Sequence, residues 1–100
     1  MNINHLTAFL DIAQTGSFQN SAQRLSITQS TISARIKTLE ERLGQSLFVR
    51  TKEGALLTPQ GHLLVPHAKV AVNAWSQAKQ TLSLPDQLDS ILSIGVQTDL

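Results

Sequence analysis

The sequence contains no cysteine and no tyrosine, and its four aromatic residues are Phe9, Phe18, Phe48 and Trp75. Without cysteine, the chain forms no disulfide, no cysteine-ligated zinc site and no thiol nucleophile. Its longest apolar runs are far shorter than the roughly 20 residues of a membrane-spanning helix, and no charged-then-apolar leader opens the chain. We therefore expect a cytoplasmic protein with a mostly aliphatic core and no membrane partner.

Groupings of residues that carry catalysis are also missing. His5, His62 and His67 have no acidic partners at ligand spacing, and the last two, five residues apart, do not share a helix face. The glycines are isolated, so no loop cradles a phosphate, and no serine sits in a nucleophile elbow. The sequence therefore predicts that this segment is not an enzyme and holds no metal or cofactor.

Bulk charge is low, since the formal net charge is +1. Residues 1–60 contain six cations, namely Arg24, Arg35, Lys37, Arg42, Arg50 and Lys52, against four acids, namely Asp11, Glu40, Glu41 and Glu53. Five of these cations fall within residues 35–52. Binding to nucleic acid would have to depend on this local patch.

Residues 28–43 have the pattern of a helix with clear ends. Thr28 suits the N-cap, and Gly44 suits a left-handed residue just past the C-terminus. The buried face is predicted by apolar residues that step by 4, 3 and 4 positions: Ile32, Ile36, Leu39 and Leu43.

The opposite face of this helix is small, polar and basic in its first half. From Gln29 to Lys37 there is no acidic residue. Such a face can enter a DNA major groove without repelling the phosphates. An ordinary amphipathic helix with a solvated face is the alternative that this stretch alone leaves open.

Two shorter helices are expected before it. Residues 4–15 place Leu6, Phe9, Leu10 and Ala13 on one face, with Asn4 as a possible cap. A second helix, capped by Ser17 and ending near Leu25, turns Phe18, Ala22 and Leu25 inward. Ser26 and Ile27 then make a tight connector, which indicates a helix-turn-helix, although any three-helix bundle would share this pattern.

A β-hairpin is expected at residues 47–57. The segment LFVRT is rich in β-branched and aromatic residues, KEG is turn chemistry, and ALLT follows as a second strand. A hairpin directly after a recognition helix is a wing, and Arg50 and Lys52 would bring it to the DNA backbone or minor groove. A hairpin with a merely solvated tip is the alternative.

Thr58 and Pro59 open a long helix that should end near Leu82. Pro66 should kink it or disturb one hydrogen bond near its start. A seam for dimerisation is predicted by the 4, 3, 4, 3, 4 spacing of Leu64, Ala68, Ala71, Trp75, Ala78 and Leu82. Residues 85–90 resemble a linker, and residues 91–97 resemble the first buried strand of a second domain.

In this arrangement residues 1–83 resemble the N-terminal DNA-binding domain of LysR-type transcriptional regulators. The similarity rests on Leu6 and Phe9, GSF at 16–18, Ala22 and Leu25, TQSTIS at 28–33, IKTLEERLG at 36–44, LFVRT at 47–51, LTPQG at 57–61 and LLVPHA at 63–68. The chain departs from the family pattern at Ser30, where proline is usual, and at Ala34, where arginine is frequent.

The resemblance implies the partners and the site. It implies a homodimer paired antiparallel through the long helix, possibly a tetramer in the full-length protein, on a pseudo-palindromic duplex operator. It also implies a co-inducer-binding domain after residue 84, so a small-molecule ligand is expected only there. The family's base-reading positions fall on Gln29, Ser30, Thr31, Ser33, Ala34 and Arg35. Positions at or near the DNA backbone fall on Ser17, Phe18, Thr28, Arg50 and Thr51, and the cations Lys37 and Lys52 lie beside these two groups.

The sequence therefore predicts a mainly α fold in three parts: a winged helix-turn-helix at 1–58, a linker and dimerisation helix at 59–84, and a hinge with the first strand of an effector-binding domain at 85–100. The alternative function is a winged-helix module for protein contact, without DNA readout. An acid-free recognition face beside a cationic wing favours DNA, because a protein-binding helix usually exposes apolar anchors.

Overall fold

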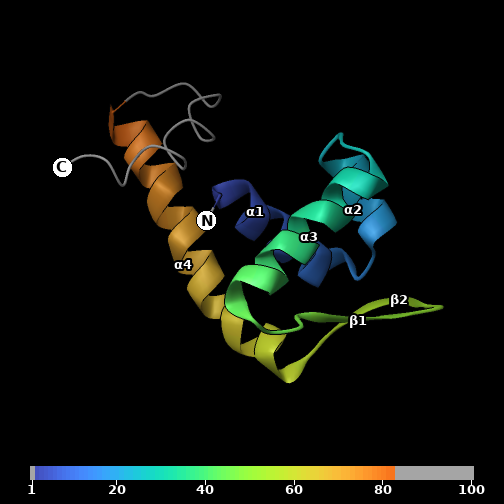
Figure 1. The fold of residues 1–100 in the computed structure, drawn as a ribbon. Coiled ribbons are helices and arrows are strands. Elements are labelled where there is room, and N and C mark those ends of the chain that lie inside the picture. Colours follow the sequence, from blue (N-terminus) through green and yellow to red (C-terminus); the bar gives the residue numbers. More distant parts are fainter. Residues whose placement is uncertain (1, 83–100) are drawn as a thin grey trace.

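The computed structural model describes residues 2–82, which form four helices and one two-stranded sheet (Figure 1). The elements are α1 (Ile3–Thr15), α2 (Phe18–Arg24), α3 (Gln29–Leu43), β1 (Phe48–Thr51), β2 (Gly54–Leu57) and α4 (Pro59–Leu82). This order confirms the predicted mainly α, winged helix-turn-helix fold with a long helix after it. The hinge and strand predicted at 85–100 lie outside the described residues.

Helix α1 is the central element, because it contacts α2, α3, α4 and β2. Its N-cap is Asn2, whose side chain accepts a hydrogen bond from the Asn4 amide at 2.9 Å. The predicted cap, Asn4, is therefore wrong: two asparagines with the same capping chemistry stand two residues apart, and the earlier one is used. Leu10 and Ala13 are only half-buried, since the buried side of α1 is completed by Ala8 and Ile12.

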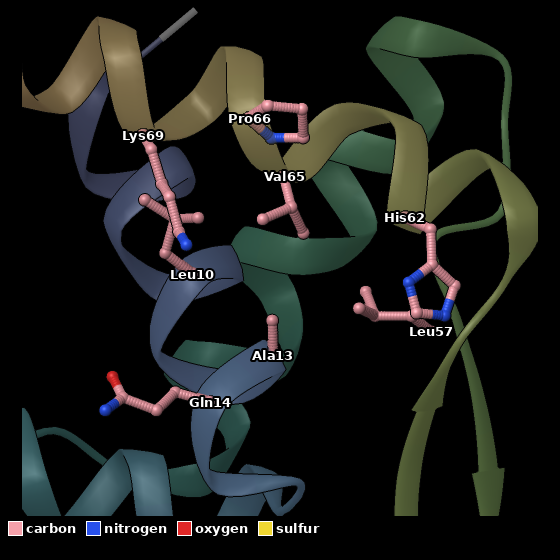
Figure 2. Close-up of a pocket in the computed structure, with 8 residues that line it drawn as sticks. All are labelled: Leu10, Ala13, Gln14, Leu57, His62, Val65, Pro66 and Lys69. Atoms are coloured by element: carbon pink, nitrogen blue, oxygen red, sulfur yellow. The ribbon is translucent and has the colours of Figure 1, made fainter.

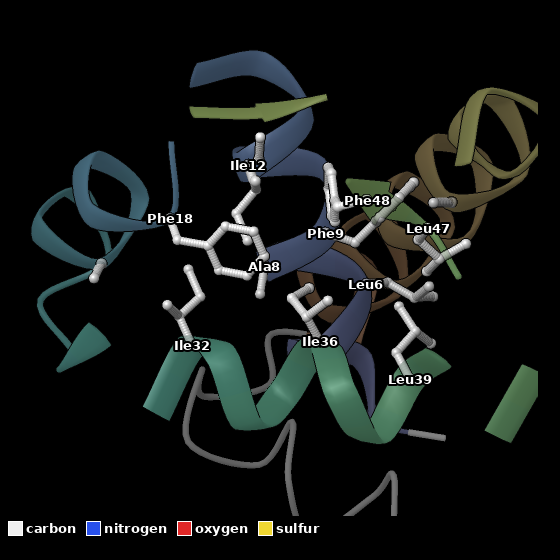
Figure 3. Close-up of a cluster of buried hydrophobic side chains, with 13 residues drawn as sticks. Leu6, Ala8, Phe9, Ile12, Phe18, Ile32, Ile36, Leu39, Leu47 and Phe48 are labelled. Carbon is white, nitrogen blue, oxygen red and sulfur yellow. The ribbon is translucent and has the colours of Figure 1, made fainter. Parts of the chain in front are cut away.

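Three phenylalanine rings from three elements meet in the core (Figure 3). The ring centroids of Phe9 and Phe48 are 5.5 Å apart, and those of Phe18 and Phe48 are 5.6 Å apart in an edge-on arrangement. Contacts of this kind add to the stabilisation from burial itself. Aliphatic residues complete the core: Leu6, Ala8, Ile12, Ala22, Ile32, Ile36, Leu39, Leu47, Ala55 and Ala68.

The connection between α2 and α3 is a turn that contains one non-glycine residue with a positive φ. Ser26 adopts a left-handed conformation, with φ of 58°, and the Ile27 amide donates to the Ala22 carbonyl at 3.0 Å. Helix α3 then has the predicted ends, with Thr28 as N-cap and Gly44 left-handed at φ 65°. Leu43 is 37% exposed, so its predicted inward position is wrong; the buried face of α3 ends one turn earlier at Leu39.

The wing is an antiparallel hairpin in which Phe48 pairs with Leu57 and Thr51 pairs with Gly54. Gly54 has φ of 140° and already belongs to β2, so the strand begins one residue earlier than predicted. Thr58 is the cap of α4 rather than part of the strand: its Oγ1 accepts from the Gly61 amide at 3.0 Å and donates to the Ser46 carbonyl at 2.6 Å.

Helix α4 lies against the body with its first half. A side chain at Gly61 would collide with the Leu47 carbonyl oxygen, so glycine allows this close approach. Pro66 lies inside the helix, where it has no N–H to donate to the carbonyl four residues earlier. None of the helices between residues 2 and 82 is long and apolar enough to cross a membrane.

The predicted dimerisation seam is not one free stripe. Ala68 is 1% exposed and belongs to the chain's own core, and Leu64 packs partly against that core. Ala68 therefore has no surface to offer a partner, because periodicity identifies an apolar face but not the neighbour that covers it; the place of half-buried Leu64 in a dimer interface remains a prediction. Of the other four residues, Trp75 and Ala78 are half-buried, while Ala71 and Leu82 are exposed.

His5, on the first turn of α1, has a pKa below the ordinary value of histidine. Burial lowers the pKa of the imidazole, and the positive charge of Arg35 on α3 lowers it further, with a smaller effect from Arg42. Its Nδ1 atom is buried without a hydrogen-bond partner in the described part of the chain. His5 is therefore neutral at pH 7. It lies at the contact between α1 and α3.

We expect the stability to fall as the pH drops below about 6.5, the ordinary pKa of histidine. Below this pH His5 binds a proton in the unfolded chain but stays neutral in the folded chain. The free energy of unfolding therefore decreases until the pH passes the lowered pKa of His5 in the folded chain. His5→Gln should remove this part of the decrease. Urea unfolding at pH 7.5 and 5.5 measures it, with His67→Gln at an exposed position on α4 as the control. An equal decrease in wild type and His5→Gln would contradict the assignment.

Candidate nucleic-acid interface

The outward face of the first half of α3 carries short polar groups and cations, as its sequence predicts. Ile32 and Ile36 are buried, and the first carboxylate within α3 is that of Glu40. The side chains left at least partly exposed are those of Gln29, Ser30, Thr31, Ser33, Ala34, Arg35 and Lys37. All six predicted base-reading positions therefore lie on accessible surface of one helix.

Hydroxyl groups at the start of α3 are linked to one another. Thr28 Oγ1 accepts from the Thr31 amide at 3.1 Å and donates to Thr31 Oγ1 at 2.8 Å. The Ser30 hydroxyl lies 3.1 Å from Thr28 Oγ1. Ser30 therefore belongs to the capping network of α3. Proline, which is usual in the family at this position, has no hydroxyl and could not make this contact. Thr28 acts first as a cap, and its predicted place near the backbone remains a prediction.

The wing is fastened to the body by backbone amides at two points. Glu40 on α3 accepts hydrogen bonds from the amides of Leu47 at 2.7 Å and Phe48 at 3.4 Å. On the other strand, the Ala55 amide donates to the Gly16 carbonyl at 2.9 Å. A side chain at Gly54 would collide with that same carbonyl, which explains why glycine occupies the position. The wing therefore has a fixed position relative to α3.

Arg50 joins the wing to the recognition helix. Its Nη2 donates to Ser33 Oγ at 2.9 Å, and its guanidinium carbon lies 3.7 Å from the centroid of the Phe18 ring. Phe18 is only 6% exposed, so its side chain offers little surface to the DNA backbone, and its predicted place at or near the backbone remains a prediction. The ring supports Arg50 instead.

The other residues predicted to contact the DNA backbone, Ser17 and Thr51, lie near Arg50. Ser17 caps α2 by accepting from the Asn20 amide at 3.0 Å. Thr51 holds the tip of the wing, donating to the Gly54 carbonyl at 3.2 Å and accepting from the Glu53 amide at 3.2 Å. A shallow hollow between the wing and α3 is lined by Ser17, Phe18, Gln19, Gln29, Arg50, Thr51, Lys52, Glu53 and Gly54. The structure thus brings Gln29 of the helix and the wing cations to one surface.

The two departures from the family pattern share a second hollow on α3. Ser30 and Ala34 line it with Thr31, Arg35, Thr38 and His5 of α1. Because Arg35 and His5 line the same hollow, Arg35 is turned toward α1, on the flank of the reading face. Its role in reading bases remains a prediction.

A separate groove lies between α1, β2 and α4 (Figure 2). It is lined by Leu10, Ala13, Gln14, Leu57, His62, Val65, Pro66 and Lys69, and takes no residue from α3. It therefore has no part in the surface formed by α3 and the wing.

Sequence reasoning missed Glu40 and the supporting role of Phe18. In the sequence Glu40 stands out only as one of four acids in residues 1–60, whereas in the structure its carboxylate holds the start of the wing. A signal was present: the buried segment at Leu47 needs partners for its amides, and Glu40 is the nearest preceding acid on the half-buried side of α3.

Curated relatives include proteins called HTH-type transcriptional regulator HdfR. Those of Yersinia pestis (strain Pestoides F) and Yersinia pseudotuberculosis serotype O:1b (strain IP 31758) are each 38% identical over 100 residues, covering 100% of this chain and 34% of the relative. The chain thus spans about a third of the length of these relatives.

Solved structures with the same fold include a LysR family transcriptional regulator and a protein–DNA complex. The LysR family transcriptional regulator VV2_1132 aligns with TM-score 0.77 and 33% identity, covering 81% of this chain and 28% of that one. The CbnR_DBD-DNA complex aligns with TM-score 0.78 and 26% identity, covering 83% of this chain and 95% of that one.

A family model matches residues 3–62, which is more than half of the chain, and its description is "Bacterial regulatory helix-turn-helix protein, lysR family". With the winged helix-turn-helix geometry described above, this match places the chain in the LysR family of bacterial helix-turn-helix regulators.

Proposed function

We propose that this chain is the DNA-binding part of a transcriptional regulator that reads double-stranded DNA in a sequence-specific way. The observation that carries the proposal is the acid-free exposed face of α3 from Gln29 to Lys37, beside a wing whose Arg50 is held against it. Helix α3 would enter the major groove, and the wing would lie on the backbone or in the minor groove. The solved CbnR_DBD-DNA complex, which shares this fold, supports the proposal.

Protein contact through the same helix is less well supported. The exposed side chains from Gln29 to Lys37 include no large apolar group that could anchor a partner. Ala34 offers only a methyl group, which suits contact with a thymine methyl. The polar groups there match base edges and phosphates better than a protein surface.

The full-length regulator would act in the bacterial cytoplasm, where chromosomal DNA lies. Its relatives are about three times as long as this chain. We therefore place any small-molecule co-inducer in an effector-binding domain that follows this segment, and none on the residues described here.

Gln29→Ala tests base reading. The Gln29 amide is exposed at the start of α3 and suits a bidentate contact with the N6/N7 edge of adenine. The variant should lose about 1–3 kcal/mol of binding free energy on a duplex selected from a random pool, and much less on random duplex. Fluorescence anisotropy measures both affinities, with Gln45→Ala beyond the other end of α3 as the control. Equal losses on both duplexes would assign Gln29 to backbone positioning, and no preference of the wild type for its selected duplex would refute sequence-specific binding.

The exposed apolar stripe on α4 is the surface we assign to a homodimer. Leu63 is 72% exposed and Val70, seven residues later, is 70% exposed; Ala71 and Ala74 are exposed beside them. This stripe is rotated from the predicted seam, because Leu64 and Ala68 already pack on the body. Small residues would let two α4 helices approach closely. Paired antiparallel, they would present two α3 helices to a pseudo-palindromic operator with half-sites about 34–36 Å apart, or a multiple of that.

Val70→Glu tests the dimer. A carboxylate without a partner in a dry helix pair should weaken dimerisation by roughly 3 kcal/mol or more, on the order of a hundredfold. Ser76→Glu adds the same charge on another exposed side of α4 and should leave the dimer intact. Sedimentation equilibrium gives the association constants. Equal dimerisation of the two variants would exclude the Leu63–Val70 stripe from the interface.

A further inference from the structure

Arg50 has two partners that fix its direction before any DNA arrives. Its Nη2 donates to Ser33 Oγ at 2.9 Å, and its guanidinium lies 3.7 Å above the Phe18 ring. Phe18 cannot move easily, since it is 6% exposed and packs edge-on against Phe48. The guanidinium is therefore presented to Ser33 by a fixed support.

The hydrogen bond from Arg50 determines whether the Ser33 hydroxyl acts as a donor or as an acceptor toward another group, such as a base. A serine hydroxyl has one donor and two acceptor positions, so a free serine in the major groove pairs with either kind of base edge. A guanidinium has donors only. Ser33 Oγ must accept from Arg50, so its proton is directed elsewhere, and the adjacent positive charge disfavours a second N–H donor at the same oxygen.

We propose that Arg50 acts through Ser33 as a positioning residue for base specificity, by fixing the Ser33 hydroxyl as a hydrogen-bond donor. The proposal rests on the proposed DNA-binding function. At the base that Ser33 faces, guanine offers N7 and O6 as acceptors and thymine offers O4, whereas cytosine offers only the N4 donor. Ser33 should therefore select against cytosine at one position of the operator.

The test starts from a duplex selected out of a random pool by the wild-type protein. Each base pair is varied in turn, and the position read by Ser33 is the one at which Ser33→Ala loses its preference. Arg50→Ala should lower the discrimination against cytosine at this position by about threefold to tenfold, the size of one net hydrogen bond. Preferences elsewhere should not change, and the double variant should match Ser33→Ala at this position.

Lys52→Ala is the matched control, because it removes one positive charge from an exposed residue of the same hairpin, whereas the hydrogen bond from the wing to Ser33 comes from Arg50. It should weaken every duplex similarly and leave the cytosine discrimination intact. Arg50→Met is a second variant that keeps packing over Phe18 but has no donor. It should lose the discrimination as Arg50→Ala does, with thermal unfolding confirming that both variants fold.

The proposal is overturned if Arg50→Ala and Arg50→Met behave like Lys52→Ala, with uniform weakening and an unchanged base preference. Arg50 would then contact phosphate alone. This outcome differs from failure of DNA reading itself, in which the wild type would show no preference for its selected duplex over random DNA.

Discussion

The surface formed by α3 and the wing depends on how Phe48 is buried at the base of the hairpin. The ring lies between Phe9 of α1 and Phe18 of α2, with centroids 5.5 and 5.6 Å away. The amides of Phe48 and of Leu47, the residue before it, are held by the Glu40 carboxylate. An isolated two-stranded hairpin is at best marginally stable in water, so these contacts with the helices give the wing its fixed position.

The magnitudes separate the contacts that hold the wing from the contact that serves reading. Burial of a phenylalanine side chain is worth roughly 1.5–3 kcal/mol, and hydrogen bonds to a charged group such as Glu40 roughly 1.5–3 kcal/mol. An exposed cation over an aromatic ring contributes about 0.5–1 kcal/mol. Phe48 and Glu40 therefore fasten the wing, whereas Arg50 adds little stability. Its position between Phe18 and Ser33 matters for what α3 presents to a ligand.

Local signals allowed the fold to be predicted well. The caps Thr28 and Gly44 define α3, and turn chemistry around Gly54 identifies the hairpin, because each depends on residues near one another in the chain. Contacts between distant residues were not predictable in this way. Arg50 meets Ser33 across 17 positions, and the burial of Phe18 depends on a ring 30 positions later. The dimerisation seam predicted on α4 differs from the exposed apolar stripe for a similar reason, because spacing shows which residues share a face but not what covers them. The body covers Ala68 and part of Leu64, whereas Leu63 and Val70 stay exposed.

Amide hydrogen exchange in the DNA-free protein tests the central claim, that the wing and α3 form one preformed surface. The Leu47 amide bonds to Glu40, and the Ala55 amide bonds to Gly16, so both report the attachment of the hairpin to the helices. These two amides should exchange about as slowly as the buried amides of α3, because they open only with the whole domain. Exchange of Leu47 and Ala55 at the rate of the exposed tip amide of Glu53, with α3 still protected, would contradict it.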